Sequence, residues 1–215
     1  MSKTLCFSTV IGLLLFAAVQ NMPAAQLDKG IESYKAKKYQ DAANLFQEVV
    51  KAEPDNIQAH YYLGLSYLAL EKNQDAESEL KKAAAIREGL KDELSLPSES
   101  QLEVAFGRLY MEQEKYEDAR TSLESAKKID PENPEAFFYS GELDIRQKSY
   151  QEAIKNLEKS ISLDPEEAYA YYYIGIAYSN IKRPDKMMDN FRTFLKLAPD
   201  APEANKVRSL LKGMR

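Results

Sequence analysis

The sequence predicts an all-α protein built from a repeated unit of two short helices. Glycines recur at spacings of 34, 43, 34 and 34 residues, apolar residues follow most of them at fixed offsets, and prolines close most of the units. A fixed period of this length is typical of helical repeat arrays. The residues in phase are Gly30, Gly64, Gly107, Gly141 and Gly175; Ala42, Ala76, Ala119 and Ala153; Phe46, Leu80, Leu123, Leu157 and Phe191; and Pro54, Pro131, Pro165 and Pro199.

The N-terminal segment has the three-part layout of a secretory signal. Lys3 precedes an uncharged run over residues 5–19, and small residues lead up to Ala25. The run is shorter than the roughly 18 to 20 residues of a membrane-spanning helix, and no Asn-x-Ser/Thr glycosylation site occurs. We therefore predict that residues 1–25 are a signal peptide and that the protein is exported to a bacterial periplasm. An uncleaved anchor facing the periplasm is the alternative. A small residue is preferred at the third position before the cleavage site, and Pro23 or Met22 stands there in this sequence.

Each unit of the array is expected to contain two helices. Bulky residues at i, i+3 and i+7, such as His60, Leu63 and Tyr67, mark one face of the first helix. The glycine beside the middle residue lets a neighbouring helix approach closely, and the alanine of the second helix has the same role. Segments such as 130–134 end one helix and provide an N-cap for the next, while segments such as 37–39 form the turn inside a unit.

Three motifs resemble the tetratricopeptide repeat family: Leu63-Gly64-x-x-Tyr67, Tyr116-x-x-Ala119-x-x-x-Leu123-x-x-Ala126, and the closing Pro131. The resemblance, to the exported bacterial type, implies a right-handed superhelical solenoid of five two-helix repeats over residues 26–201. A capping helix over residues 202–215 should cover its last repeat. Local departures from the family pattern occur at Gln26, Asn73, Glu103, Pro184 and Met187. The repeats fall at about 23–56, 57–90, 100–133, 134–167 and 168–201.

Nine additional residues separate the second and third repeats, and we place this insertion within residues 87–100. Helix-favouring residues continue over 81–93, so the second repeat's last helix should run long until 94–97 breaks it. The segment from Ser100 to Glu103 has the pattern of a capping box that restarts the array.

The composition argues against most catalytic and cofactor-dependent classes. The net charge of −5 disfavours a general nucleic-acid binder. Cys6 is the only cysteine and His60 the only histidine, and the phosphate-loop, dinucleotide and calcium-loop motifs do not occur. We therefore expect no enzyme activity, no cofactor and no metal, and we assign His60 to helix packing. Contact with a membrane is expected only if the N-terminal segment is uncleaved.

The family resemblance also implies where a partner would bind. In tetratricopeptide proteins the concave wall is lined by fixed positions of each first helix, and here these positions are rich in aromatic residues. We expect a protein or peptide segment of unknown identity to bind there. The alternative is that the rings pack between adjacent repeats. The candidate residues are Tyr61, Tyr62, Leu65, Arg108, Phe138, Tyr139, Glu142, Tyr169, Tyr172, Tyr173 and Ile176.

These features predict a non-enzymatic protein-interaction scaffold of the cell envelope, which binds a partner segment in an aromatic-lined concave groove. The alternative is a regulatory or assembly subunit of an envelope enzyme complex, such as one of cytochrome maturation or cell-wall synthesis, with the chemistry on the partner.

Overall fold

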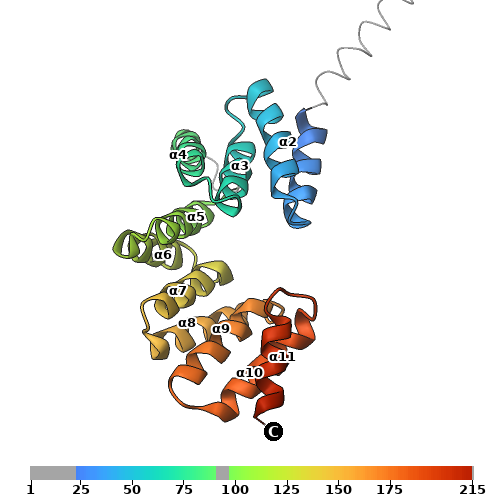
Figure 1. The fold of residues 1–215 in the computed structure, drawn as a ribbon. Helices are drawn as coiled ribbons and strands as arrows, with labels where there is room; N and C mark the ends of the chain where they lie inside the picture. The colour runs from blue at the N-terminus through green and yellow to red at the C-terminus, as the bar shows by residue number, and fades with distance from the viewer. Residues whose placement is uncertain (1–22, 91–96, 215) are drawn as a thin grey trace, which may run out of the picture. The chain divides into compact units, whose positions relative to one another are not determined.

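A computed structural model describes residues 23–90 and 97–214, and Figure 1 shows that these residues form helices joined by short connections. No strand occurs among them, so the all-α prediction is confirmed. The chain divides into two compact units, one ending at Ser98 and the other beginning at Glu99. No helix in this described part is both long and apolar enough to cross a bilayer. The predicted signal peptide lies outside the described residues, apart from 23–25, which are helical.

The helices follow the predicted two-per-repeat plan. In the first unit, a helical segment over residues 23–35 precedes α2 (Tyr39–Ala52), α3 (Ile57–Ala69) and α4 (Asn73–Gly89). In the second unit, α5 packs against α6, α7 against α8 and α9 against α10, and each first helix also packs against the first helix of the next repeat. The helices of the second unit are α5 (Glu99–Glu112), α6 (Tyr116–Ile129), α7 (Pro134–Arg146), α8 (Tyr150–Leu163), α9 (Ala168–Asn180), α10 (Pro184–Leu197) and α11 (Ala204–Gly213).

The glycine column brings the two helices of a repeat close together. A Cβ atom on Gly64 would lie 2.8 Å from Leu80 Cγ, and one on Gly107 would lie 2.7 Å from Leu123 Cγ. Carbon atoms in good contact are about 3.5 to 4 Å apart, so a larger residue would push the helices apart. Both leucines are buried. The close approach predicted at these columns is therefore confirmed.

A residue with left-handed backbone follows the first helix of each repeat. After α3, the backbone N–H of Lys72 donates to the Tyr67 carbonyl, and that of Glu71 donates to the Leu68 carbonyl. This pair of bonds is the Schellman pattern, which satisfies carbonyls at a helix end. Glycine adopts such a conformation most easily, yet lysine or glutamate occupies all five turns. The residues, with φ between 58° and 62°, are Lys37, Glu71, Glu114, Lys148 and Lys182.

The long helix predicted before the insertion ends earlier than expected. α4 has 17 residues against 14 in α2 and α6, so it does run long. It ends at Gly89, and Leu90 already has extended backbone, so α4 does not continue to the predicted break at 94–97; residues 91–93 of that prediction lie outside the described residues. Glycine is a poor helix residue and is favoured just where a helix ends.

The capping box predicted at Ser100 is also wrong. α5 begins at Glu99, so Ser100 lies inside the helix. Ser100 is buried, and a buried hydroxyl requires hydrogen-bond partners. It donates to the Ala126 carbonyl at 3.1 Å and accepts from the Asn133 amide at 2.8 Å. The serine therefore ties α5 to the end of α6 and the start of α7.

Candidate protein-interaction site

In the first unit, the candidates Tyr61 and Leu65 are packing residues, whereas Tyr62 is partly exposed. Tyr61 and Leu65 on α3 have only 6% and 5% of their surface exposed. The ring of Tyr62 stacks on Phe46 with 5.6 Å between centroids, and it meets the Tyr34 ring edge-on at 5.6 Å. The placement of Tyr61 and Leu65 on an open groove is therefore wrong, because neighbouring groups cover both side chains.

In the second unit, the candidate aromatic residues form a continuous row across α7 and α9. Phe138 on α7 lies 5.9 Å from Tyr173 on α9, measured between ring centroids. The row continues from Phe138 to Tyr139 at 5.0 Å, and from Tyr173 to Tyr172 at 5.6 Å and on to Tyr169 at 6.1 Å. All five side chains are partly exposed. We call these five residues the aromatic row.

Neighbouring side chains hold the aromatic row in place on both α9 and α7. Tyr172 packs on the buried rings of Phe194 and Phe191, with centroids 5.1 and 6.0 Å away. Ile176, one helical turn beyond Tyr172, is partly exposed as well. At the other end, the guanidinium carbon of Arg108 lies 4.8 Å from the Tyr139 ring centroid, a cation–π geometry. The candidate residues of the second unit therefore form a preorganised surface.

An ion-pair network borders the row. Arg146 binds Glu142 at 2.8 Å on its own helix and Glu112 of α5 at 2.7 Å. The candidate residue Glu142 is thus paired inside the unit. Burial raises the pKa of Tyr173, and the nearby Glu142 carboxylate raises it further. The Tyr173 hydroxyl therefore stays neutral at physiological pH and acts through hydrogen bonds and its ring.

A hydrogen bond also joins the row to the residue that precedes α11. The Tyr169 hydroxyl donates to Glu203 at 2.9 Å, and burial together with this carboxylate raises the pKa of Tyr169 to about 12. The sequence-based candidates include neither Arg146 nor Glu203. The i,i+4 spacing of Glu142 and Arg146 could have indicated the first. Glu203 lies one repeat away from Tyr169, and no local sequence pattern indicates their contact.

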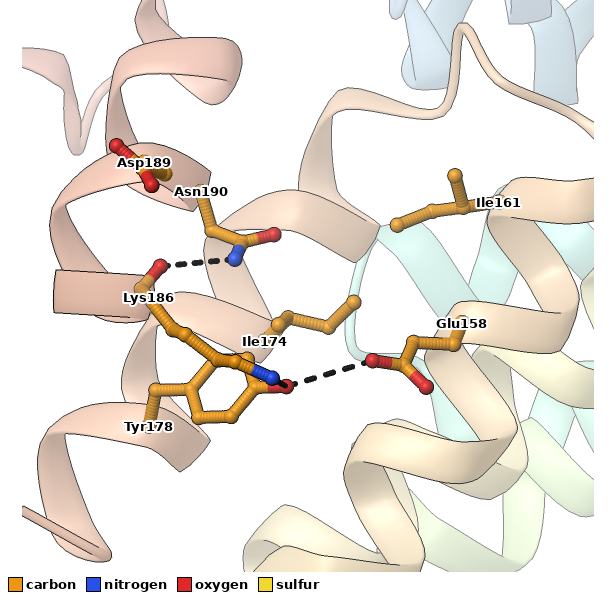
Figure 2. A pocket seen from close by; sticks show the side chains of 7 residues that line it. All are labelled: Glu158, Ile161, Ile174, Tyr178, Lys186, Asp189 and Asn190. Atoms are coloured by element: carbon orange, nitrogen blue, oxygen red, sulfur yellow. Dashed lines mark hydrogen bonds between the residues drawn. The ribbon is translucent and has the colours of Figure 1, made fainter. Parts of the chain in front are cut away.

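A pocket of about 310 Å³ lies among α8, α9 and α10 (Figure 2). Its central group is the Tyr178 hydroxyl, which donates to Glu158 at 3.4 Å and accepts from the Lys186 ammonium at 3.3 Å. The second carboxylate of the pocket, that of Asp189, pairs with Arg192. The Tyr178 hydroxyl therefore links α8 to α10, and Asp189 is paired on its own helix.

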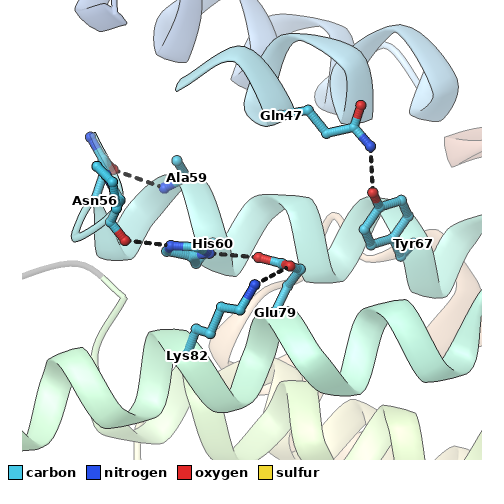
Figure 3. Close-up of polar contacts among 8 residues, drawn as sticks. Gln47, Asn56, Ala59, His60, Tyr67, Glu79 and Lys82 are labelled. Carbon is cyan, nitrogen blue, oxygen red and sulfur yellow. Dashed lines mark hydrogen bonds and ion pairs between the residues drawn. The ribbon is translucent and has the colours of Figure 1, made fainter. Parts of the chain in front are cut away.

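The single histidine is part of a buried polar clamp in the first unit (Figure 3). His60 Nε2 lies 2.8 Å from the Pro54 carbonyl, which can only accept, and Nδ1 lies 2.6 Å from Glu79. Lys82 binds the other oxygen of Glu79 at 2.8 Å. The hydrogen bond to Glu79 raises the pKa of His60 despite its burial. Both ring nitrogens thus donate, and the prediction that His60 serves helix packing is confirmed.

Metal-binding geometry does not occur in the described part of the chain: no three His, Cys, Asp or Glu side chains there lie close enough to share an ion.

Comparison with known proteins identifies the family. The family model described as the tetratricopeptide repeat protein 21 C-terminal ARM domain matches residues 19–209. The chain therefore belongs to the tetratricopeptide repeat family. No curated protein sequence matches the chain significantly.

Solved structures of tetratricopeptide proteins share the fold. TTC0263, a thermophilic tetratricopeptide protein of Thermus thermophilus, is 17% identical with a TM-score of 0.73, over 89% of this chain and 97% of that one. MamA is 22% identical with a TM-score of 0.54, over 86% and 96% of the two chains. YrrB, described as a tetratricopeptide protein with an unusual peptide-binding site, is 18% identical with a TM-score of 0.53, over 86% and 90%. At these identities the similarity establishes the fold alone.

Proposed function

We propose that the protein is a non-enzymatic scaffold whose second unit binds a segment of a partner protein along the aromatic row. The observation that carries this proposal is the continuity of five partly exposed rings, fixed by buried neighbours and ion pairs. Rigid aromatic side chains contribute much of the binding energy at protein interfaces. The peptide-binding site named for YrrB supports peptide recognition by this fold. An affinity in the micromolar range, about −8 kcal/mol, is expected.

The proposed scaffold acts outside the cytoplasm, in the periplasm or on the membrane facing it. Support comes from the uncharged run over residues 5–19, with Lys3 before it and small residues after it. Mass spectrometry of the protein from its own host tests this localisation. A new N-terminus near Ala25 is the expected result, and an intact Met1 in the membrane fraction would indicate the anchored form.

Site-specific photo-cross-linking tests the proposed binding surface. A benzophenone amino acid replaces Tyr139 in the row, and a matched variant carries it at Lys155, an exposed residue of α8. The Tyr139 variant should form one dominant adduct in cells of the native host, and the Lys155 variant should not. The same adducts from both positions, or none from Tyr139, would contradict the proposal.

A further inference from the structure

A second pocket, of about 280 Å³, opens beside the aromatic row, between α9, α10 and the C-terminal helix α11. Tyr172 belongs both to the row and to this pocket. Most of its lining is apolar and comes from all three helices: Tyr172 and Ile176 of α9, Phe191 of α10, and Val207 and Leu210 of α11. Ser179 and Asn180, at the end of α9, add polar groups. The binding surface of the second unit therefore extends from the row onto α11.

The size and depth of the pocket suit one large side chain. Sites for small molecules and cofactors usually enclose about 300 to 1,000 Å³, so this pocket is at the lower limit. Phe191 and Val207 are buried and form its deeper wall, whereas Leu210 is 44% exposed at the edge. The C-terminal helix was predicted to cover the last repeat, and Leu210 is a residue of this helix that stays outside the covered face. An exposed leucine beside an open apolar pocket is a typical contact for an incoming apolar group.

The charge at the pocket indicates what should lie next to that side chain. Lys206 is the only charged residue that lines the pocket, and it makes no ion pair with any described residue. The closest acidic residue along the chain, Glu203, already accepts the hydrogen bond from Tyr169. A positive group at the edge of an apolar pocket is complementary to a carboxylate on the partner.

We propose that this pocket receives a bulky apolar side chain of the bound segment, and that an acidic residue next to it in that segment pairs with Lys206. The inference rests on the proposed function and gives α11 a second role. The helix covers the last repeat through Ala204 and Val207, and it also supplies a wall of the binding site through Lys206 and Leu210.

Selection of short random peptides displayed on phage, with the full chain as bait, tests this inference. Peptides selected by the wild-type protein should be enriched in a bulky apolar residue beside Asp or Glu. Lys206→Glu should weaken these peptides about ten-fold in fluorescence anisotropy and should select peptides with Lys or Arg instead. Leu210→Asp should also weaken them about ten-fold. Both residues are exposed, and unchanged thermal melting confirms that the variants fold.

Lys212→Glu is the matched control, because Lys212 is an exposed lysine of α11 outside the pocket. It makes the same charge change and should alter affinity by less than about two-fold. Selected peptides that bind Lys206→Glu and Leu210→Asp as tightly as wild type, but lose affinity for Tyr139→Ala, would overturn the pocket and leave the aromatic row as the binding site. Failure to select any peptide would overturn peptide recognition by this unit, and the pocket with it.

Discussion

The two units use the same repeat positions in different ways. Tyr61 in the first unit is equivalent in repeat position to Val104, Phe138 and Tyr172 in the second. Tyr61 and Val104 are buried, whereas Phe138 and Tyr172 are partly exposed. The next position on the same face holds the buried Leu65 in the first unit and the partly exposed Ile176 in the second. Repeat position therefore decides which helix face a residue occupies, whereas the surrounding side chains decide whether that face is covered.

The polar pairs of the two units also differ in which partner is the more deeply buried. In the first unit this is His60, which is paired with Glu79. The second unit buries Asp144, with 1% of its surface exposed, and this carboxylate accepts hydrogen bonds from Arg120 at 3.0 Å and Asn156 at 2.8 Å. Each unit should therefore respond to a different substitution and to pH in a different way.

Removing the buried ring should have the largest effect. Tyr61→Ala leaves a cavity in a packed region and should lower the free energy of unfolding by about 4 kcal/mol. Tyr139→Ala removes a partly exposed ring and should cost about 1 kcal/mol. Urea denaturation followed by circular dichroism measures both. Equal losses for the two variants would show that burial does not separate the units.

Removing the cation beside Asp144 should have the next largest effect. Arg120→Ala leaves a buried carboxylate without its charged partner and should destabilise the second unit by about 3 kcal/mol. Arg192→Ala is the control, since Arg192 pairs with Asp189 on the surface and such pairs contribute less than about 1 kcal/mol. Hydrogen exchange should place the loss in α6 to α8. An Arg120→Ala protein as stable as the control would mean that Asn156 alone satisfies Asp144.

The histidine clamp predicts a pH dependence confined to the first unit. The pKa of His60 is raised above 6.5 by its bond to Glu79, so its stabilisation is fully present below pH 6.5 and is lost as the pH rises through the raised value. Burial opposes ionisation of Glu79, but bonds from His60 and Lys82 lower its pKa below 4.5. That contribution is present above pH 4.5 and is lost as the pH falls further. The clamp should therefore stabilise the unit most between pH 4.5 and 6.5.

His60→Phe tests this dependence, because phenylalanine occupies the equivalent position at Phe137. The variant should lose about 2 kcal/mol at pH 6, where the Pro54 carbonyl is left without its donor, and less at pH 9. Urea midpoints measured across this range provide the comparison. A wild-type protein whose stability rises steadily from pH 6 to 9 would contradict a protonated His60.

The parts of the fold that were predictable are those in which packing partners keep a fixed distance in sequence. Gly64 meets Leu80 and Gly107 meets Leu123 at the same spacing, so the periodicity predicts the two-helix repeat. The rings of the second unit were named from the positions that line the concave wall in the tetratricopeptide family, and not from this spacing. The side chains that cover Tyr61 and the hydrogen bond from Tyr169 to Glu203 could not be predicted from the sequence. These contacts join segments that come close together only when the repeats have stacked. The turns inside the units were predicted, as at 37–39, but their left-handed backbone was not, because residues such as Glu71 gave no glycine signal.

Substitutions in the left-handed turns should have the smallest effect on stability. They also serve as a control for the comparison of the two units, because the turns have the same geometry in both. Glu71 and Glu114 have φ of 59° and 58°, and the following residues donate the same closing hydrogen bond, Lys72 to Tyr67 and Lys115 to Tyr110. A non-glycine residue in this conformation costs about 1 to 2 kcal/mol, while glycine adds an entropic cost of about 0.5 to 1 kcal/mol. Glu71→Gly and Glu114→Gly should therefore each stabilise their unit by about 0.5 kcal/mol.

Glu124→Gly is the control, because Glu124 lies inside α6, and this substitution should instead lower the free energy of unfolding by about 1 kcal/mol. Urea midpoints measured for the three variants test this prediction. If glycine raised the stability of one unit and lowered that of the other, the units would differ in backbone conformation as well as in the burial of their helix faces.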